Sequence, residues 1–312
     1  MTGVFDAKAS QTVYDLAIFI KSYAPDFANV QRLLTSIATN NRDDIPIYIC
    51  VPDSDVEKSK TFANVTIVPE SFFDVELPTE RIHGRTLGYL RQQIIKLSVH
   101  QLQVAKNYII LDSDAYIIRP FHKADFLHSS GACYTVLVED LDQFASPWYR
   151  AYADRRRQAL QQIANRIGYK GTRLKTCHGN VTFSADVLES FAQWCLDEKL
   201  TSSDLMEIGP YEFSWYNFYI QTKFPEQVFA IEPFIRYVHV KNEYRSFRYQ
   251  GITIEELARS YVGICLNSNW TRGRDNKYLD GLSKQTAGFR LRGYRDLLER
   301  IVNGVLARIT KR

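Results

Sequence analysis

The stretch YIILDSDAYIIRPF, residues 108–121, carries two acids, Asp112 and Asp114, between two apolar runs. The uninterrupted apolar run before the acids is typical of a strand buried on both faces of a sheet. Burying a carboxylate is costly unless a cation or a shared proton compensates its charge, and two neighbouring carboxylates cost more. We therefore expect a buried strand that ends at an acidic site.

Strand-like and helix-like segments alternate on both sides of this stretch. Upstream, the pattern predicts strands at residues 16–23, 45–55 and 65–70 and helices at residues 27–40 and 86–102. Downstream, it predicts a strand within 131–140, a helix at 148–167, a strand and a helix within 178–191, a helix at 211–221 and two strands within 228–240. Such alternation indicates an α/β fold with a mixed, mostly parallel sheet flanked by helices.

The length of 312 residues allows one large domain or two smaller lobes. We expect a single α/β domain with two halves, residues 1–125 and 126–245, followed by a C-terminal extension, residues 246–312. The extension ends in an amphipathic helix, residues 294–312, with a basic face. Packing of this helical tail on a core is the first interpretation, and peripheral attachment to an anionic membrane is the alternative.

Charge and cysteine usage restrict the class of protein. A net charge of +4 fits phosphorylated small molecules at least as well as a nucleic-acid backbone. Without RNA-binding or zinc-finger signatures, no nucleic-acid partner is expected. The five cysteines are scattered and never spaced CxxC, which favours a reducing compartment over a disulfide scaffold. With no signal-peptide pattern and no apolar run of 18 residues, we expect a cytoplasmic protein.

The ends of the predicted strands indicate where a ligand would bind. In an open parallel sheet the binding crevice lies beyond the carboxyl ends of the strands. Residues 21–23 (Lys-Ser-Tyr), Asp53 and the acid pair all follow such strands. Asp112 and Asp114, with Ser113 between them, can project the same way from an extended segment. They would offer hard oxygen ligands to Mg²⁺ or Mn²⁺, which in turn would bridge two phosphates.

Two other interpretations of the acid pair stay open. The first is an Asx turn that simply closes a strand. The second is the nucleophile motif of haloacid-dehalogenase phosphatases, which also places D-x-D after a strand. That motif sits on the first strand and carries a hydroxyl side chain such as Thr two residues after the second Asp. Here Tyr116 occupies that position, and several elements precede the motif.

Taken with its neighbours, the acid pair resembles a known family. LDSDAYIIRPF (residues 111–121) is similar to the D-x-D segment of GT-A-fold glycosyltransferases, which use nucleotide-sugars. The wider set resembles a largely uncharacterised bacterial family of glycosyltransferases associated with surface-polysaccharide synthesis. The resemblance spans residues 16–270 and includes residues 21–37, 45–55, 91–97 and 261–270. It implies a GT-A-like (Rossmann-like) fold and transfer of a sugar from a nucleotide-sugar donor to a hydroxyl of a glycan or lipid-linked saccharide.

The resemblance also implies roles for individual residues. The expected donor-binding residues are Lys21, Ser22, Tyr23, Asp53, Gln92, Lys96, Asp112, Ser113 and Lys241. Tyr23 would stack on the base, Lys96 would reach a phosphate or the sugar, and Lys241 would contact the diphosphate. Gln92 and Lys96 share one face of the predicted helix, and the alternative for both is a solvated helix face. Residues 177–180 (CHGN) supply small polar groups that suit close approach of a sugar.

The metal site would be completed by a histidine. His239 follows a late strand, and in GT-A enzymes a late histidine joins the D-x-D acids as a metal ligand, a role that neutral imidazole suits. The expected ligands of Mn²⁺ or Mg²⁺ are therefore Asp112, Asp114 and His239. A structural histidine is the alternative for His239.

The catalytic base is the remaining role. An inverting transfer needs a carboxylate that takes the proton of the attacking hydroxyl. Glu212, at the start of the aromatic-rich helix, is the first candidate, and Asp140 and Asp142 come next. The alternative for Glu212 is a first-turn acid favoured by the helix dipole. The expected catalytic residues are thus Glu212, as the base, and Asp114, which would act through the cation that it binds.

Two rival functions remain from other classes. A nucleotidyltransferase acting on sugar phosphates also uses carboxylate-bound Mg²⁺, but it needs a Gly-rich basic loop after its first strand, and KSYAPD (residues 21–26) does not supply one. A non-catalytic nucleotide-sugar-binding relative is the second rival, and the intact D-x-D argues against it.

Overall fold

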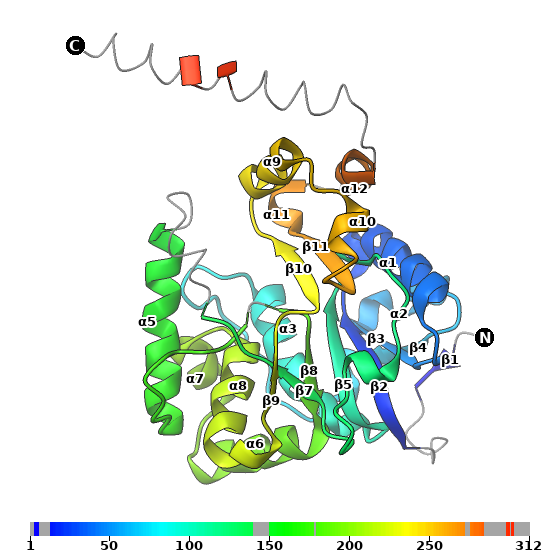
Figure 1. The fold of residues 1–312 in the computed structure, drawn as a ribbon. Helices are drawn as coiled ribbons and strands as arrows, with labels where there is room; N and C mark the ends of the chain where they lie inside the picture. The colour runs from blue at the N-terminus through cyan, green and yellow to red at the C-terminus, as the bar shows by residue number, and fades with distance from the viewer. Residues whose placement is uncertain are drawn as a thin grey trace. The chain divides into compact units, whose positions relative to one another are not determined.

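The computed structural model describes residues 3–5, 13–139, 150–177, 179–271, 275–283, 298–299 and 301–302. The chain forms two compact units. Unit 1 contains residues 1–31, 41–113 and 121–233, and unit 2 contains residues 32–40, 114–120 and 234–312 (Figure 1). The acid pair falls at a division between the units, because Ser113 ends one segment of unit 1 and Asp114 begins a segment of unit 2. The expected halves, residues 1–125 and 126–245, stay a prediction.

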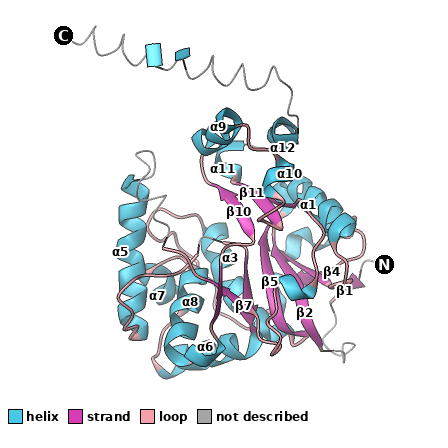
Figure 2. Ribbon diagram, viewed as in Figure 1, coloured by secondary structure: helices cyan, strands magenta, loops and turns pink. Residues whose placement is uncertain are grey.

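Unit 1 is built on a six-stranded sheet with the order β1-β4-β3-β2-β5-β8. Every neighbouring pair is parallel except β5 and β8, which are antiparallel. The strands are β1 (Gly3–Val4), β2 (Tyr14–Lys21), β3 (Ile47–Val51), β4 (Thr66–Pro69), β5 (Ala105–Asp112) and β8 (Val181–Ser184). Helices flank the sheet (Figure 2), which confirms the predicted α/β, Rossmann-like class.

The central strands explain why their sequences are continuously apolar. β2 lies between β3 and β5, and its residues 16–20 have no exposed surface. Residues 108–111 of β5 are equally buried. A strand covered on both faces needs apolar side chains at every position, so it lacks the alternation of a half-exposed strand. The polar residues therefore appear where these strands end.

Helix α8 (Glu212–Lys223) of unit 1 carries an acid into the core. The helices of this unit are α2 (Val56–Ser59), α3 (Leu87–Leu97), α5 (Arg150–Ile167), α6 (Ala185–Asp197), α7 (Ser202–Ile208) and α8. The short strands β7 (Tyr134–Val136) and β9 (Phe229–Ile231) pair in parallel. α8 contacts α3, α5 and α6, and all of its residues 212–220 are buried. Its aromatic side chains, such as Trp215 and Tyr216, are therefore core residues, and Glu212 is buried among them.

Unit 2 contains a three-stranded sheet with the order β10-β11-β6. Its strands are β6 (Ala115–Ile117), β10 (Ile235–Val238) and β11 (Gly263–Leu266). Its helices are α9 (Lys241–Gln250), α10 (Ile254–Leu257), α11 (Ser268–Thr271) and α12 (Asp275–Ser283), together with residues 32–40 of α1 (Phe27–Asn40). The sequence predicted two strands within 228–240, and both form, but β9 pairs with β7 whereas β10 pairs with β11. The part of the chain expected as a helical extension also contains β11, which was not predicted.

Among the described residues, no helix is long and apolar enough to cross a membrane. Most of the predicted tail helix, residues 294–312, lies outside the described residues.

Candidate active site at the carboxyl edge of the sheet

The carboxyl ends of β2 and β5 lie side by side at one edge of the unit 1 sheet. The two strands are parallel and in register, with Lys21 opposite Asp112. On the other side of β2, Lys21 aligns with Cys50 of β3, and Asp53 begins the 3-10 turn after that strand. The sheet thus brings residues from three separate segments to one edge, as the sequence predicted from the parallel order of the strands.

Lys96 of α3 links two acids at this edge. Its Nζ lies 2.6 Å from Oδ1 of Asp112 and 2.9 Å from Oε1 of Glu212. Lys96 and Glu212 are buried, whereas 16% of the side-chain surface of Asp112 is exposed to solvent. Two carboxylates face one ammonium group, so the trio carries one negative charge in excess. We call Lys96, Asp112 and Glu212 the acid–lysine cluster.

Two glutamines of α3 also make polar contacts with this cluster. Nε2 of Gln92 donates to Oδ1 of Asp112 over 3.3 Å. The amide of Gln93 faces Glu212, and in the orientation that satisfies both groups its nitrogen donates to both carboxylate oxygens. Gln92 and Lys96 lie one turn apart, as predicted, and both contact Asp112. Gln93 contacts the second acid, so α3 provides donors for both carboxylates.

Burial and charge shift the pKa values of the cluster in opposite ways. Burial disfavours the charged form of Lys96, but the charges of Asp112 and Glu212 outweigh it and raise its pKa, so the residue stays an ammonium. Burial raises the pKa of Glu212, and the charge of Asp112 adds to this effect, whereas Lys96 opposes it. The pKa of Glu212 rises on balance, because burial and the neighbouring carboxylate of Asp112 outweigh the attraction of the single ammonium group. Glu212 is thus the group at which the excess charge is most readily relieved by a proton.

Two buried polar atoms at the same edge lack a partner. The Nδ2 of Asn180 and the Oγ of Ser22 are buried, and neither has a hydrogen-bond partner within the part of the chain that the structure describes. Asn180 is fixed at the end of β5, because its Oδ1 accepts a hydrogen bond from the backbone N–H of Asp112 over 2.8 Å. Ser22 directly follows β2. Buried polar groups are nearly always satisfied in native proteins, so each of these two atoms calls for a partner outside the described residues, such as a water or a bound group.

Other predicted residues at this edge have protein partners. Lys21 pairs with Glu70 at 2.8 Å and donates to the carbonyl of Ser22 over 2.8 Å. Asp53 accepts hydrogen bonds from the backbone N–H and the hydroxyl of Ser71, and the backbone distance is 3.1 Å. Tyr23 is exposed, with 48% of its surface accessible, so its ring is open to stacking.

Asp114, His239 and Lys241 belong to unit 2. Oδ1 of Asp114 accepts a hydrogen bond from the thiol of Cys265 over 3.1 Å. The ring of His239 stacks on Tyr237 with the centroids 4.5 Å apart, and its backbone N–H donates to Glu243, which caps α9. Lys241 begins this helix. In the described parts of the chain, no group of three His, Cys, Asp or Glu residues is placed to hold a metal ion.

Sequence reasoning did not identify several residues of the site. The links from Lys96 to both acids were not predicted, nor were the partners Glu70 and Cys265. Asn180 was noted only as a small polar group. The next candidates for a catalytic base, Asp140 and Asp142, lie outside the described residues. The sequence did contain one signal. Glu212 is the single acid in the aromatic-rich helix, and an acid buried in such a helix requires a buried cation or a proton as its partner.

Comparison with known proteins identifies the family without assigning an activity. No curated protein matches this chain. One family model, described as a family of unknown function (DUF6492), matches residues 11–167. The match covers just over half of the chain and includes β2, β5, the acid pair and Lys96. The chain therefore belongs to DUF6492, a family of unknown function.

Proposed function

We propose that this protein is a metal-dependent glycosyltransferase. It would move a sugar from a nucleotide-sugar donor to a hydroxyl of a glycan or lipid-linked saccharide, in the synthesis of a bacterial surface polysaccharide. The proposal draws on the D-x-D resemblance and on the polar edge of the unit 1 sheet. The five free cysteines support a reducing, cytoplasmic location. Attachment to the inner face of the membrane through the C-terminal helix that the sequence predicts is part of the same proposal.

One observation carries the proposal. Asp112 ends a central parallel strand beside Lys21, and two buried polar atoms without described partners, on Ser22 and Asn180, lie at the ends of the same two strands. An α/β sheet binds its ligands at this edge. An acid, a lysine, a hydroxyl and an amide are groups that recognise phosphates and sugar hydroxyls.

The acids suit a divalent cation in type and number. Mg²⁺ is commonly held by one or two carboxylates together with substrate phosphates, so the lack of a described three-residue metal cluster is compatible with this role. Asp112 retains an accessible carboxylate, and Asp114 follows it by two residues. His239 remains the third ligand of the proposal. When bound, the cation would stabilise negative charge on the departing nucleoside diphosphate.

The residues of the chain would divide the remaining tasks. The exposed ring of Tyr23 would stack on the base, and Asp53, Ser22 and Ser113 would border the nucleoside. Lys96 would hold Asp112 in place and contribute positive charge beside the phosphates. Lys241 would contact the diphosphate from the start of α9.

Glu212 would take the proton from the attacking hydroxyl. Its raised pKa favours this role, because a base works best when its pKa approaches the working pH. Gln93 and Lys96 orient its carboxylate.

Donor binding is the direct test. Nucleotide-sugars with UDP, GDP, dTDP and CMP should be screened by thermal shift with and without Mn²⁺. We expect stabilisation by one class of base, and only with the metal. Asp112→Asn and Asp114→Ala should abolish this effect without unfolding the protein. Asp15→Asn is the matched control, because Asp15 is exposed and lies at the amino end of β2.

The outcomes separate three conclusions. Unchanged donor affinity in Asp114→Ala would mean that the acid pair does not bind the metal–diphosphate group. Saturable binding without hydrolysis or transfer of any donor would replace the enzyme by a nucleotide-sugar-binding protein. Metal-dependent turnover that Asp114→Ala abolishes would support the transferase.

A further inference from the structure

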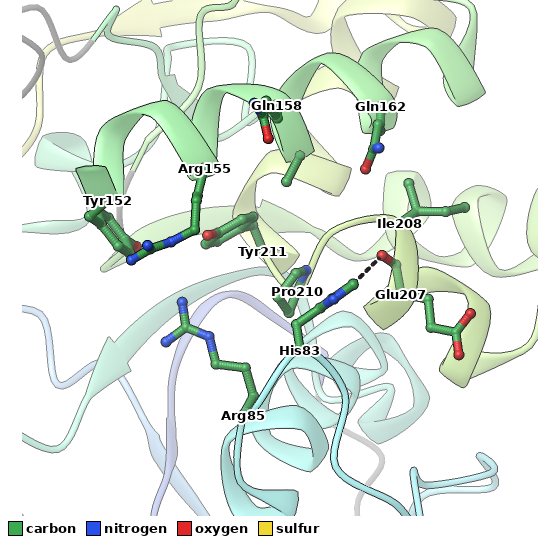
Figure 3. A pocket seen from close by; sticks show the side chains of 11 residues that line it. His83, Arg85, Tyr152, Arg155, Gln158, Gln162, Glu207, Ile208, Pro210 and Tyr211 are labelled. Carbon is green, nitrogen blue, oxygen red and sulfur yellow. Dashed lines mark hydrogen bonds between the residues drawn. The ribbon is translucent and has the colours of Figure 1, made fainter. Parts of the chain in front are cut away.

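A second polar site lies in unit 1, and none of the residues of the acid–lysine cluster lines it. It is a cavity of about 290 Å³ bounded by α5, by the loop before α3 and by the turn between α7 and α8 (Figure 3). A neighbouring cavity of about 520 Å³ is formed by residues 79–83 together with Ser203 and Glu207. The two cavities share the lining residues His83 and Glu207, so they are neighbours, and we consider them together. We call the pair the α5 groove.

The α5 groove is fixed by backbone and ring contacts. Nε2 of His83 lies 2.7 Å from the carbonyl oxygen of Glu207, which joins the loop before α3 to α7. The hydroxyl of Tyr89 donates to the carbonyl of Pro210 over 2.9 Å. The guanidinium of Arg85 lies 4.8 Å from the centre of the Tyr89 ring, so this arginine is held in place. These contacts form the groove without a ligand.

Positive charge gathers at one end of the groove. Figure 3 shows Arg85 and Arg155 reaching toward the same space from opposite walls. Neither forms an ion pair with a residue that the structure describes. Glu207 is the single carboxylate of the first cavity, and its side chain lies on the far side of His83 from Arg85 (Figure 3). Two guanidinium groups in this arrangement favour a carboxylate or phosphate as the ligand.

The remaining walls suit a saccharide. Gln158 and Gln162 project from successive turns of α5, and Tyr152 and Tyr211 line the charged end. Amides and phenols donate to and accept from sugar hydroxyls, and phenol rings offer flat apolar faces. Two neighbouring cavities would suit a chain longer than one ring.

The residues that line the groove include the direct sequence neighbour of the proposed catalytic base. Pro210 and Tyr211 line the groove, and Glu212 follows them as the first residue of α8. The hydroxyl of Tyr89 binds Pro210, and Tyr89 also lies within electrostatic range of Glu212. A ligand in the groove would therefore lie next to the segment that carries the proposed base.

We propose that the α5 groove binds a saccharide chain with an anionic group, and that Arg85 and Arg155 together hold the anion. This assignment deepens the proposed function, on which it rests, because it makes an acidic saccharide the acceptor. The anion is a sugar carboxylate or a sugar phosphate, and both share the chemistry that two arginines recognise.

Direct binding measurements without donor or metal test the assignment. The probes are trigalacturonic acid, which carries carboxylates, trehalose 6-phosphate, which carries a phosphate, and a neutral galactose trisaccharide. Affinities should be measured by calorimetry at low salt and again at high salt. We expect one of the two anionic probes to bind at least about tenfold more tightly than the neutral one, with weaker binding at high salt.

Three substitutions locate the site. Arg155→Ala and Arg85→Ala should each weaken the anionic probe about tenfold. Arg155 is exposed, so its loss should leave the fold intact even if Arg85→Ala disturbs the packing on Tyr89. Arg157→Ala is the matched control, because Arg157 lies on α5 but does not line the groove, and it should bind like the wild type.

Each outcome decides the assignment. The anionic probe that binds identifies the acceptor's group as a carboxylate or a phosphate. Failure of both anionic probes, or equal affinity in Arg155→Ala and the wild type, overturns the assignment. Because no donor or metal is present, this failure is distinct from failure of donor binding by Asp112 and Asp114.

Discussion

Lys96→Met tests whether one buried ammonium group holds the acid–lysine cluster together. The wild-type Nζ lies within 2.9 Å of both Asp112 and Glu212, and methionine keeps the length of the side chain without its charge. The substitution removes the ammonium group and leaves the two acids with uncharged donors such as the amides of Gln92 and Gln93. Removing one partner of a buried ion pair costs about 3–5 kcal/mol. Asp112 is partly exposed and can regain water, so we expect about 3 kcal/mol at pH 8.

The loss should depend on pH in a defined direction. The pKa of Glu212 in the folded protein lies above its ordinary value of 4.5, so the folded state binds this proton more tightly than the unfolded state. A raised acid pKa therefore favours folding at low pH, and this contribution is lost as pH rises through the folded pKa. Without Lys96 the pKa of Glu212 rises further. The destabilisation should then shrink at pH 5, by up to about 1.4 kcal/mol for each unit of additional shift.

Urea unfolding of wild type and Lys96→Met at pH 5 and pH 8 measures both effects. Lys106→Met is the matched control, because Lys106 pairs with Asp15 at 3.0 Å on the exposed surface, where an ion pair contributes at most about 1 kcal/mol. In the Lys96→Met background, Glu212→Gln should restore part of the loss at pH 8, because it removes one of the two acids. Equal stability of Lys96→Met and Lys106→Met, or a larger loss at pH 5 than at pH 8, would refute the reasoning.

Three further predictions concern catalysis, packing and thiol reactivity. Turnover of the wild type should rise with pH through the raised pKa of Glu212, because a base must be deprotonated to act. Glu212→Gln should lower kcat about 10²–10⁴-fold. A flat pH profile would exclude this role. Gly263→Ala should cost about 1–3 kcal/mol in thermal unfolding, because the new Cβ would lie 2.8 Å from the backbone oxygen of Tyr116, and an unchanged Tm would contradict this. Burial raises the pKa of the Cys50 thiol to about 12 and that of Cys133 to about 11, so a disulfide reagent at pH 8 should modify both only after denaturation.

The elements that the sequence predicted well are those whose signal is local and long. The helix at residues 27–40 matches α1 (Phe27–Asn40), because its apolar residues repeat along one face over several turns. The central strands were found because a strand covered on both faces must be apolar throughout. Their parallel order then placed Lys21 and Asp112 at one edge, which the register of β2 and β5 bears out.

The missed elements are short or depend on distant partners. β6 has three residues and β11 has four, too few for a periodic pattern, and both exist because they pair with each other. The contact between Lys96 and Glu212 joins residues 116 positions apart, so no local pattern reports it. The α5 groove likewise combines residues 79–85, 152–162 and 203–211. Such sites arise from packing, and the spacing of their residues in the sequence does not show which residues will be in contact.

The energetics of the acid–lysine cluster favour a functional role over a structural one. Well-packed apolar residues in place of a buried ion pair are often neutral or stabilising, so stability alone does not call for two acids and a lysine beside the core. The cluster sets two carboxylates against one ammonium group, and polar atoms of Asn180 and Ser22 at the same strand ends have no partner among the described residues. A group that supplies positive charge and hydrogen-bonding partners would relieve both costs at once. A cation bound to a diphosphate has this chemistry, which is why the cost of the cluster supports a donor site at the strand ends.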